Sequence, residues 1–206
     1  MFKSPAKLGV EEIEKIMKYD LGIVGALLCG CLLLLPNYNL RANDDQNRGQ
    51  STCSEGWYVT GYYVPREDEL PDTEVQIDVE RVGTLGFSQK FISETRTEGW
   101  GITRFGWSLG YYSGGWHRSD AGPLDASGKL LTEGAIAIDR SLIPHGAEVQ
   151  ISTLPSPWSA KVFRASDVGV GIVGQHIDVF TGTGRAAEEE TFRITSNDNR
   201  VCFTSK

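Results

Sequence analysis

Three aspartates in the stretch 135–184 interrupt runs of apolar residues that have the composition of β-strands. Asp139 and Asp167 each end such a run, and Asp178 lies inside one. A carboxylate within an apolar strand costs free energy unless it has a partner or a task. Three of them in one short stretch therefore predict a shared site, and they place the functional part of the chain in its second half.

Composition favours a soluble globular domain rich in β-structure. Hydrophobic residues make up 40% and charged residues 23% of the 206 residues, which is ordinary for such a domain. The 24 glycines, with 5 tryptophans and 7 tyrosines, favour an all-β fold with tight turns. The net charge of -7 argues against nucleic acid as a partner, because little is available to neutralise phosphates.

The N-terminal region has the pattern of an export signal. Residues 21–35 are apolar and uncharged, which is shorter than the roughly 20 residues that span a bilayer but matches the core of a secretory signal. We therefore predict that residues 1–42 are a signal peptide or an N-terminal membrane anchor; a lipoprotein box ending at Cys31 is a third reading. The expected location is the periplasm or cell envelope, with the outer membrane as one option, and membrane association would run through this segment. Residues 43–54 are polar and predict a linker.

Two cysteines, Cys53 and Cys202, lie at the two ends of the predicted folded region, 55–206. In an exported chain an oxidising compartment allows them to form a disulfide. Two unrelated thiols are the alternative.

Hydrophobic alternation and turn residues predict most of the secondary structure. Helices are expected at 90–97 and 182–190. The expected strands cover 57–65, 74–81, 136–139, 148–151, 161–166, 176–180 and 191–194. The segment 99–116 is dense in glycine and aromatic residues and predicts loops with sharp turns.

Three segments resemble the 3D domain, which is named for its three aspartates and is shared with the membrane-bound lytic murein transglycosylase A family. They are 138–146 (IDRSLIPHG), 166–174 (SDVGVGIVG) and 176–184 (HIDVFTGTG). The segment 59–65 (VTGYYVP) is similar to the strand that opens the catalytic barrel of this family. The resemblance implies that residues 55–206 form a six-stranded double-psi β-barrel.

The resemblance also implies a chemistry and roles for the aspartates. Enzymes of this family cleave the β-1,4 bond between N-acetylmuramic acid and N-acetylglucosamine in peptidoglycan and leave a 1,6-anhydro product. By position, Asp178 is the general acid and base, Asp167 supports it, and Asp139 is structural. No cofactor is implied. The three histidines show no metal-ligand spacing, so no metal site is predicted.

Two features depart from the family pattern. Asp167 is followed by Val-Gly-Val in place of the usual Thr-Gly-Gly, which removes a hydroxyl beside Asp167. The span between Pro65 and Ala135 is short for the large second domain of the full transglycosylases. We therefore expect that domain to be absent and the groove to be shallow.

A lytic reaction needs one carboxyl group that is protonated at the start. Apolar neighbours of Asp178 and an ionised Asp167 would both raise the pKa of Asp178 above the roughly 3.9 of free aspartate. Aromatic rings would stack on the sugars. Candidates for the sugar-binding surface are Thr60, Tyr62, Tyr63, Trp100, Trp107, Tyr111 and Trp116, with only one of the two adjacent tyrosines lining the groove because strand neighbours face opposite sides.

Two other functions remain open from the sequence. This type of barrel also occurs as a non-catalytic module that binds polysaccharide or loosens the wall. A hydrolase of another envelope glycan is the second alternative.

Overall fold

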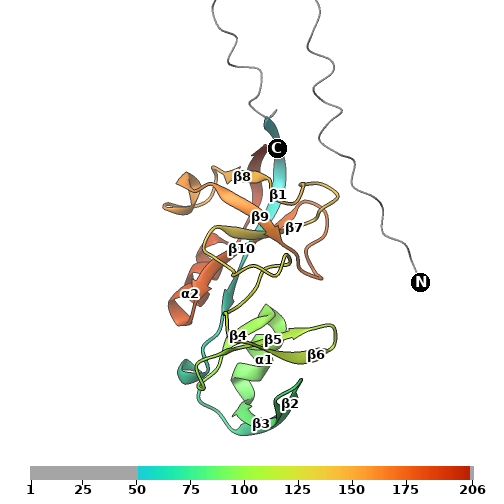
Figure 1. Ribbon diagram of the computed structural model, residues 1–206. Coiled ribbons are helices and arrows are strands. Elements are labelled where there is room, and N and C mark those ends of the chain that lie inside the picture. Colours follow the sequence, from blue (N-terminus) through green and yellow to red (C-terminus); the bar gives the residue numbers. More distant parts are fainter. Residues whose placement is uncertain (1–50, 205–206) are drawn as a thin grey trace, which may run out of the picture. The chain divides into compact units, whose positions relative to one another are not determined.

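The computed structural model describes residues 51–204, shown as a ribbon in Figure 1. The predicted signal or anchor, 1–42, lies outside the described residues, as does most of the predicted linker. Within 51–204 the helices are too short or too polar to cross a membrane.

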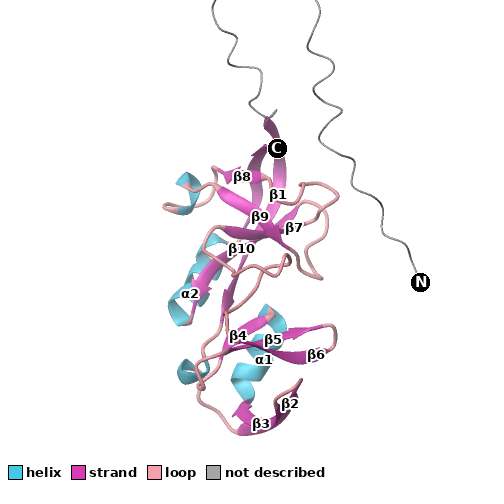
Figure 2. Ribbon diagram, viewed as in Figure 1, coloured by secondary structure: helices cyan, strands magenta, loops and turns pink. Residues whose placement is uncertain are grey.

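Six strands close into a barrel in the order β1-β10-β7-β9-β8-β11. Their bounds are β1 Ser51–Val64, β7 Ala135–Ile138, β8 Glu148–Ile151, β9 Phe163–Asp167, β10 His176–Thr183 and β11 Ser196–Thr204. The fold is mostly β, as predicted, and Figure 2 shows how little of it is helical. The double-psi crossing of the strands stays a prediction.

The barrel core follows from alternation along these strands. In β8, Val149 and Ile151 are fully buried, while Glu148 and Gln150, which alternate with them, are exposed. β7 is buried along its whole length, as expected for a strand that is paired on both sides, with β10 and with β9. Ile177 and Val179 are also fully buried and belong to the same core. Asp178 therefore lies between two residues that anchor β10 in the barrel.

A second sheet lies between β1 and β7 in the sequence, and it corrects the prediction of loops at 99–116, a segment that contributes to three of its strands. It consists of β2 Glu74–Val79, β3 Gly83–Ser88, β4 Trp100–Ile102, β5 Ser108–Tyr112 and β6 Gly115–Ser119, in the order β3-β2-β6-β5-β4. We call this five-stranded sheet with helix α1 (Gln89–Glu98) the inserted sheet. Short 3-10 helices lie outside both sheets, η2 at Glu67–Glu69 and η3 at Trp158–Ala160.

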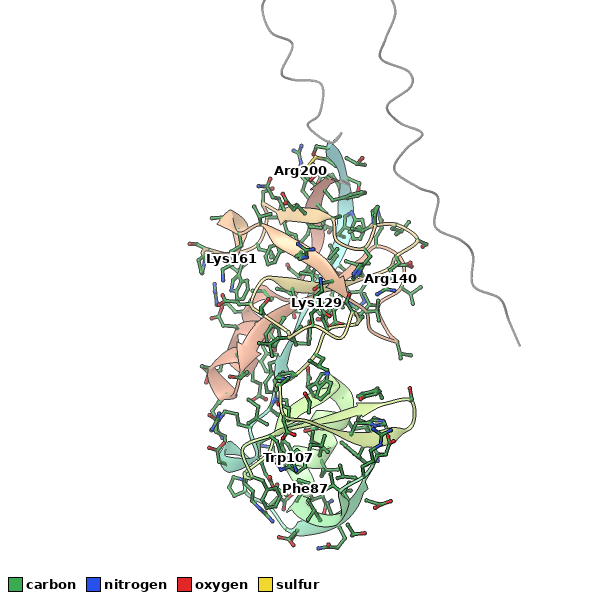
Figure 3. The ribbon with its side chains drawn as sticks, viewed as in Figure 1. Phe87, Trp107, Lys129, Arg140, Lys161 and Arg200 are labelled. Carbon is green, nitrogen blue, oxygen red and sulfur yellow. A yellow bond between two sulfur atoms is a disulfide. The ribbon has the colours of Figure 1, made fainter. Side chains whose placement is uncertain are left out.

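The inserted sheet has its own apolar core, which explains how so short a segment folds. Phe87, Phe91 and Leu109 are fully buried in it, and Trp107 is buried against them. Figure 3 shows Phe87 and Trp107 within this part of the chain. β5 and β6 are joined by the two residues Ser113 and Gly114, both with positive φ, which is the geometry of a tight hairpin.

Helix α2 spans Arg185–Ile194 and confirms the predicted helix at 182–190. The predicted strand at 191–194 is wrong, because the helix continues through it. Ala187, Thr191 and Ile194 are buried on one face of α2, so the β-branched residues that favoured a strand serve helical packing instead. The other predicted helix is confirmed by α1.

The disulfide between Cys53 and Cys202 is present, as predicted. The two cysteines are direct partners in the antiparallel pairing of β1 with β11. β1 begins at Ser51 and so takes in the last four residues of the expected linker.

Gly61 allows β1 to pack closely against α2. A Cβ atom at this position would lie 2.7 Å from Thr191 Cα and 3.1 Å from Ile194 Cδ1. We expect Gly61→Ala to lower the free energy of unfolding by roughly 1–3 kcal/mol, since backbone and core atoms must shift. Urea denaturation measures the loss. Gly171→Ala, where a Cβ would meet no atom within 4 Å, is the control; an equal loss in both variants would contradict the packing argument.

Candidate functional site

Asp178 is held by Thr60 on the neighbouring strand. β1 and β10 run parallel with Thr60 opposite Asp178. The Thr60 hydroxyl donates to Asp178 Oδ1 at 2.6 Å, and Thr60 Oγ1 also lies 3.0 Å from His176 Nε2. Asp178 is half-buried, so its carboxyl group is partly withdrawn from water and is fixed by a neutral donor.

Asp167 ends β9 and is held more tightly than Asp178. The Tyr62 hydroxyl donates to Asp167 Oδ2 at 2.8 Å. The backbone N–H groups of Ala126 and Val168 donate to Oδ1 at 3.0 and 2.9 Å. The hydroxyl that Val168 lacks is therefore not required to orient Asp167, because three other donors do so.

The charge of Asp167 acts on the carboxyl group of Asp178. Burial raises the pKa of Asp178, and the charge of Asp167 raises it further, whereas the Thr60 hydrogen bond and the charge of His176 lower it. Burial also raises the pKa of Asp167, against the effect of its three donors. Burial and these two carboxylates raise the pKa of Tyr62 far above its usual range. Tyr62 thus stays a hydrogen-bond donor at any ordinary pH.

Asp139 follows β7 and accepts hydrogen bonds from two loop segments. Its Oδ1 accepts from the backbone N–H and the hydroxyl of Ser141 at 2.8 and 2.6 Å. Its Oδ2 accepts from the N–H of Gly174 at 2.8 Å. These bonds lower the pKa of Asp139. The structure thus links Asp167 and Asp178 electrostatically, while Asp139 ties two loop segments together.

The two adjacent tyrosines of β1 have separate partners, as strand alternation requires. Tyr62 bonds to Asp167, whereas the Tyr63 hydroxyl donates to Glu94 Oε2 at 2.6 Å on α1. Of the two, Tyr62 is thus the one beside the aspartates. The N–H of Tyr63 donates to Glu98 Oε2 at 3.2 Å, so the end of α1 is joined to β1.

Glu98 belongs to the electrostatic surroundings of the site and is missed by the sequence reasoning. Burial raises its pKa to about 7, and the charge of Asp178 contributes in the same direction. Nothing in its local sequence signals this, because a glutamate near the end of a short polar helix is normally exposed. Its position depends on how α1 packs against β1.

Three of the predicted sugar-binding aromatics pack within the inserted sheet. Trp107 is buried with its ring edge-on to Phe87, 6.0 Å between centroids. Tyr111 packs on Trp116 at 4.6 Å, with Arg96 of α1 over its ring. Both face the core of the inserted sheet because they alternate with residues of its other face. Trp116 is buried in the same cluster. Sugar binding by these three residues stays a prediction.

The raised pKa of Glu98 predicts a pH dependence of stability. The folded chain holds a proton on Glu98 up to a pKa of about 7, whereas the unfolded chain releases it near 4.5. The free energy of unfolding therefore falls as pH rises through that window. Glu98→Gln removes this loss, so we expect the variant to match the wild type at pH 5 and to exceed it at pH 8 by about 1–3 kcal/mol.

Urea denaturation at the two pH values measures this difference. Gln keeps an oxygen that accepts from the Tyr63 N–H. The exposed Glu189→Gln on α2 is the matched control, and it is expected to follow the wild type at both pH values. A Glu98→Gln variant that is no more stable than wild type at pH 8 would show that Glu98 ionises freely.

Among residues 51–204, no three or more His, Cys, Asp or Glu side chains gather in a way that would hold a metal ion.

Comparison with known proteins agrees with the resemblance predicted from the sequence. Residues 134–198 match the family model of the 3D domain. Escherichia coli MltA with bound chitohexaose has a similar fold, with a TM-score of 0.58 at 15% identity over 72% of each chain. No curated protein matches the sequence.

Two further solved structures resemble the chain. A membrane-bound lytic murein transglycosylase from Agrobacterium tumefaciens matches with a TM-score of 0.53 at 16% identity, covering 75% of this chain and 76% of that one. MltA from Neisseria gonorrhoeae matches with a TM-score of 0.51 at 16% identity over 75% of each chain. At such identities the likeness is one of fold, and it extends well beyond residues 134–198.

Proposed function

We propose that this protein is a peptidoglycan lytic transglycosylase that cleaves the β-1,4 bond between N-acetylmuramic acid and N-acetylglucosamine. Asp178 is the general acid and base, and Asp167 supports it. The observation that carries the proposal is the pair of carboxyl groups. Asp178 is half-buried, it and Asp167 are both paired with Ala137, on the two sides of β7, and the charge of Asp167 raises the pKa of Asp178. The fold is similar to that of lytic transglycosylases. The double-psi topology and the glycan as ligand are part of the same proposal.

The hydrogen bonds support the assignment of the proton to Asp178. Within residues 51–204, Asp167 accepts three hydrogen bonds, while Asp178 accepts one from Thr60. Donors stabilise the ionised form of a carboxyl group. Two neighbouring carboxylates share protons unequally, so the proton resides on the one with fewer donors. Asp167 is then the charged partner and Asp178 the acid.

The proposed reaction needs no protein group for proton transfer other than the carboxyl group of Asp178. Asp178 donates its proton to the glycosidic oxygen as the bond from that oxygen to the muramic acid C1 breaks and the ring gains oxocarbenium character. The 6-hydroxyl oxygen of the same sugar then bonds to C1, and the Asp178 carboxylate accepts the hydroxyl proton. The product is a 1,6-anhydro ring, and Asp178 ends protonated as it began.

Thr60, Tyr62 and Asp139 have supporting roles in this proposal. Thr60 fixes the carboxyl group of Asp178, and Tyr62 fixes that of Asp167. Asp139 is structural, since it joins the Ser141 turn to Gly174.

Export to the periplasm or cell envelope is also proposed, and the Cys53–Cys202 disulfide supports it, because disulfides persist in oxidising compartments. Whether residues 1–42 are cleaved or retained as an anchor is a separate question, which N-terminal sequencing of the exported protein answers.

Incubation with purified murein, followed by mass spectrometry of the released sugars, tests the proposal. Anhydro ends are the expected result. Reducing ends would overturn it in favour of a hydrolase, and binding without release of sugars would favour a non-catalytic wall-binding module.

A further inference from the structure

We infer that Ser127 and His145 are positioning residues, and that the contact between their side chains holds a turn against the carboxyl group of Asp167. The consequence for turnover rests on the proposed function, whereas the hold on Asp167 does not. Two loops meet at this contact, and both are hydrogen-bonded to the same strand, β9.

The first loop is the tight turn between Asp125 and Lys129. The Asp125 N–H donates to the Lys129 carbonyl oxygen at 2.7 Å, and Asp125 Oδ1 accepts from the backbone N–H groups of Ser127 and Lys129 at 2.8 and 3.0 Å. The turn is therefore held together by its own bonds and can shift as one unit. From this turn the Ala126 N–H donates to Asp167 Oδ1 at 3.0 Å.

The second loop follows β7 and carries His145. The neighbouring Gly146 donates its N–H to the Ala165 carbonyl oxygen at 2.6 Å, and the Ala165 N–H donates to the Ala147 carbonyl oxygen at 3.0 Å. Ala165 lies on β9 two residues before Asp167. His145 is therefore attached to the same strand that carries the aspartate.

The side chains of Ser127 and His145 join the two loops. Ser127 Oγ lies 2.9 Å from His145 Nε2. A hydroxyl group both donates and accepts, so this hydrogen bond forms whether Nε2 is bare or carries a proton. The contact closes a ring of bonds that runs from Asp167 through the turn to His145 and back along β9. Without it, among residues 51–204, only the Ala126 N–H would link residues 125–129 to β9 by a hydrogen bond.

The contact acts on the turn more than on the whole fold. Ser127 and His145 are exposed, and one such hydrogen bond shifts a local opening equilibrium by about 3- to 10-fold. The Ala126 donor lowers the pKa of Asp167, whereas the charge of Asp125 on the same turn raises it. Because these effects oppose one another, the Ala126 amide reports on the turn more directly than the pKa of Asp167 does.

Hydrogen exchange of single amides, followed by NMR in the whole protein, tests the inference. We expect Ser127→Ala and His145→Ala each to lower the protection of the Ala126 N–H by about 3- to 10-fold. The Gly128 N–H donates to the Asp125 carbonyl oxygen within the turn, and it should keep its protection because the turn shifts without unfolding. The double variant should match either single variant, since both remove the same contact.

Two further variants separate the contact from the residues that make it. His145→Gln keeps a side-chain amide that can donate to or accept from the Ser127 hydroxyl, so protection near that of wild type is expected. Thr73→Ala is the matched control, because Thr73 Oγ1 donates to Gln89 Oε1 at 3.2 Å in another exposed contact, between the loop before β2 and α1. It should leave the protection of the Ala126 N–H unchanged.

The release of anhydro sugars from murein measures the consequence for the proposed reaction. In Ser127→Ala we expect kcat to fall by about 3- to 10-fold, the effect of one hydrogen bond. KM should change little, because the turn holds Asp167 and not the glycan. His145→Gln should restore kcat to near the wild-type value.

Unchanged protection of the Ala126 N–H in both single variants overturns the inference. Additive losses in the double variant, or equal losses at Ala126 and Gly128, also overturn it, because the contact would then not be what holds the turn. Lowered protection with a wild-type kcat would overturn the positioning role. If the protection changes as expected but wild type releases no anhydro sugars, the proposed function fails while the hold on Asp167 stands.

Discussion

Asp178→Asn is expected to lower the release of anhydro sugars from murein by about 10²- to 10⁴-fold, the range for loss of a general acid–base group. Asparagine has nearly the same shape as aspartate and can still accept the hydroxyl of Thr60 at the position where Asp178 Oδ1 accepts it. It can neither give a proton to the glycosidic oxygen nor take one from the 6-hydroxyl. Initial rates by mass spectrometry measure the loss, and near-UV circular dichroism checks the fold.

Asp139→Asn is the matched control for this variant. Both aspartates belong to the stretch 135–184 and both accept side-chain hydroxyl groups, but Asp139 serves loop structure. We expect it to retain most of its turnover with some loss of stability. Near-wild-type turnover in Asp178→Asn would remove Asp178 from the reaction. An equal loss of turnover in a well-folded Asp139→Asn variant would contradict the assignment of Asp178 as catalytic and Asp139 as structural.

The sequence predicts best those parts of the fold that depend on local alternation. Strand β8 lies at the predicted residues, 148–151, because apolar and polar residues alternate there and the apolar face is buried. The three aspartates can be recognised for the same reason, since a charged residue within an apolar, strand-like run breaks the pattern. Local rules thus locate most of the barrel strands and the three aspartates, whereas the role of Asp178 as the acid is implied by the family resemblance.

Local sequence patterns do not predict elements whose stability comes from contacts with residues distant in the sequence. β11 carries the polar run from Ser196 to Arg200, and Asn199 is nevertheless buried because its side chain bonds to the Trp57 carbonyl oxygen and to Ser196. The inserted sheet relies on aromatic packing around Phe87, and only β2 shows the alternation that predicts a strand at 74–81. Its β5–β6 hairpin is not predicted, although Ser113 and Gly114 form the turn between these strands.

The surroundings of Asp178 depend on strand register and could not be predicted residue by residue. Thr60 meets Asp178 only because β1 and β10 pair in parallel with these residues opposite one another. A shift by one residue would turn every side chain to the other face. Glu98 enters the site through the packing of α1 on β1. Parallel pairing between strands more than a hundred residues apart leaves no local trace in the sequence.

The disulfide makes the largest single contribution to stability that we expect from any covalent or side-chain feature described here. Cys53 and Cys202 are separated by 149 residues, so the bond closes a loop that contains nearly all of the folded chain. Chain entropy assigns such a loop about 5 kcal/mol, with about 2–5 kcal/mol typical when native disulfides are removed. We expect the double variant Cys53→Ala/Cys202→Ala to lose stability in that range, measured by urea denaturation.

Two comparisons show whether that loss comes from the closed loop. Wild type with its disulfide reduced should unfold at the same urea concentration as the double variant, because neither has the cross-link. The bond also joins β1 to β11, and β1 carries Thr60 and Tyr62. Since the constraint acts mainly on the unfolded chain, the double variant should keep its turnover below its unfolding transition. A loss of turnover in the folded variant would instead show that the disulfide holds β1 in register against β10.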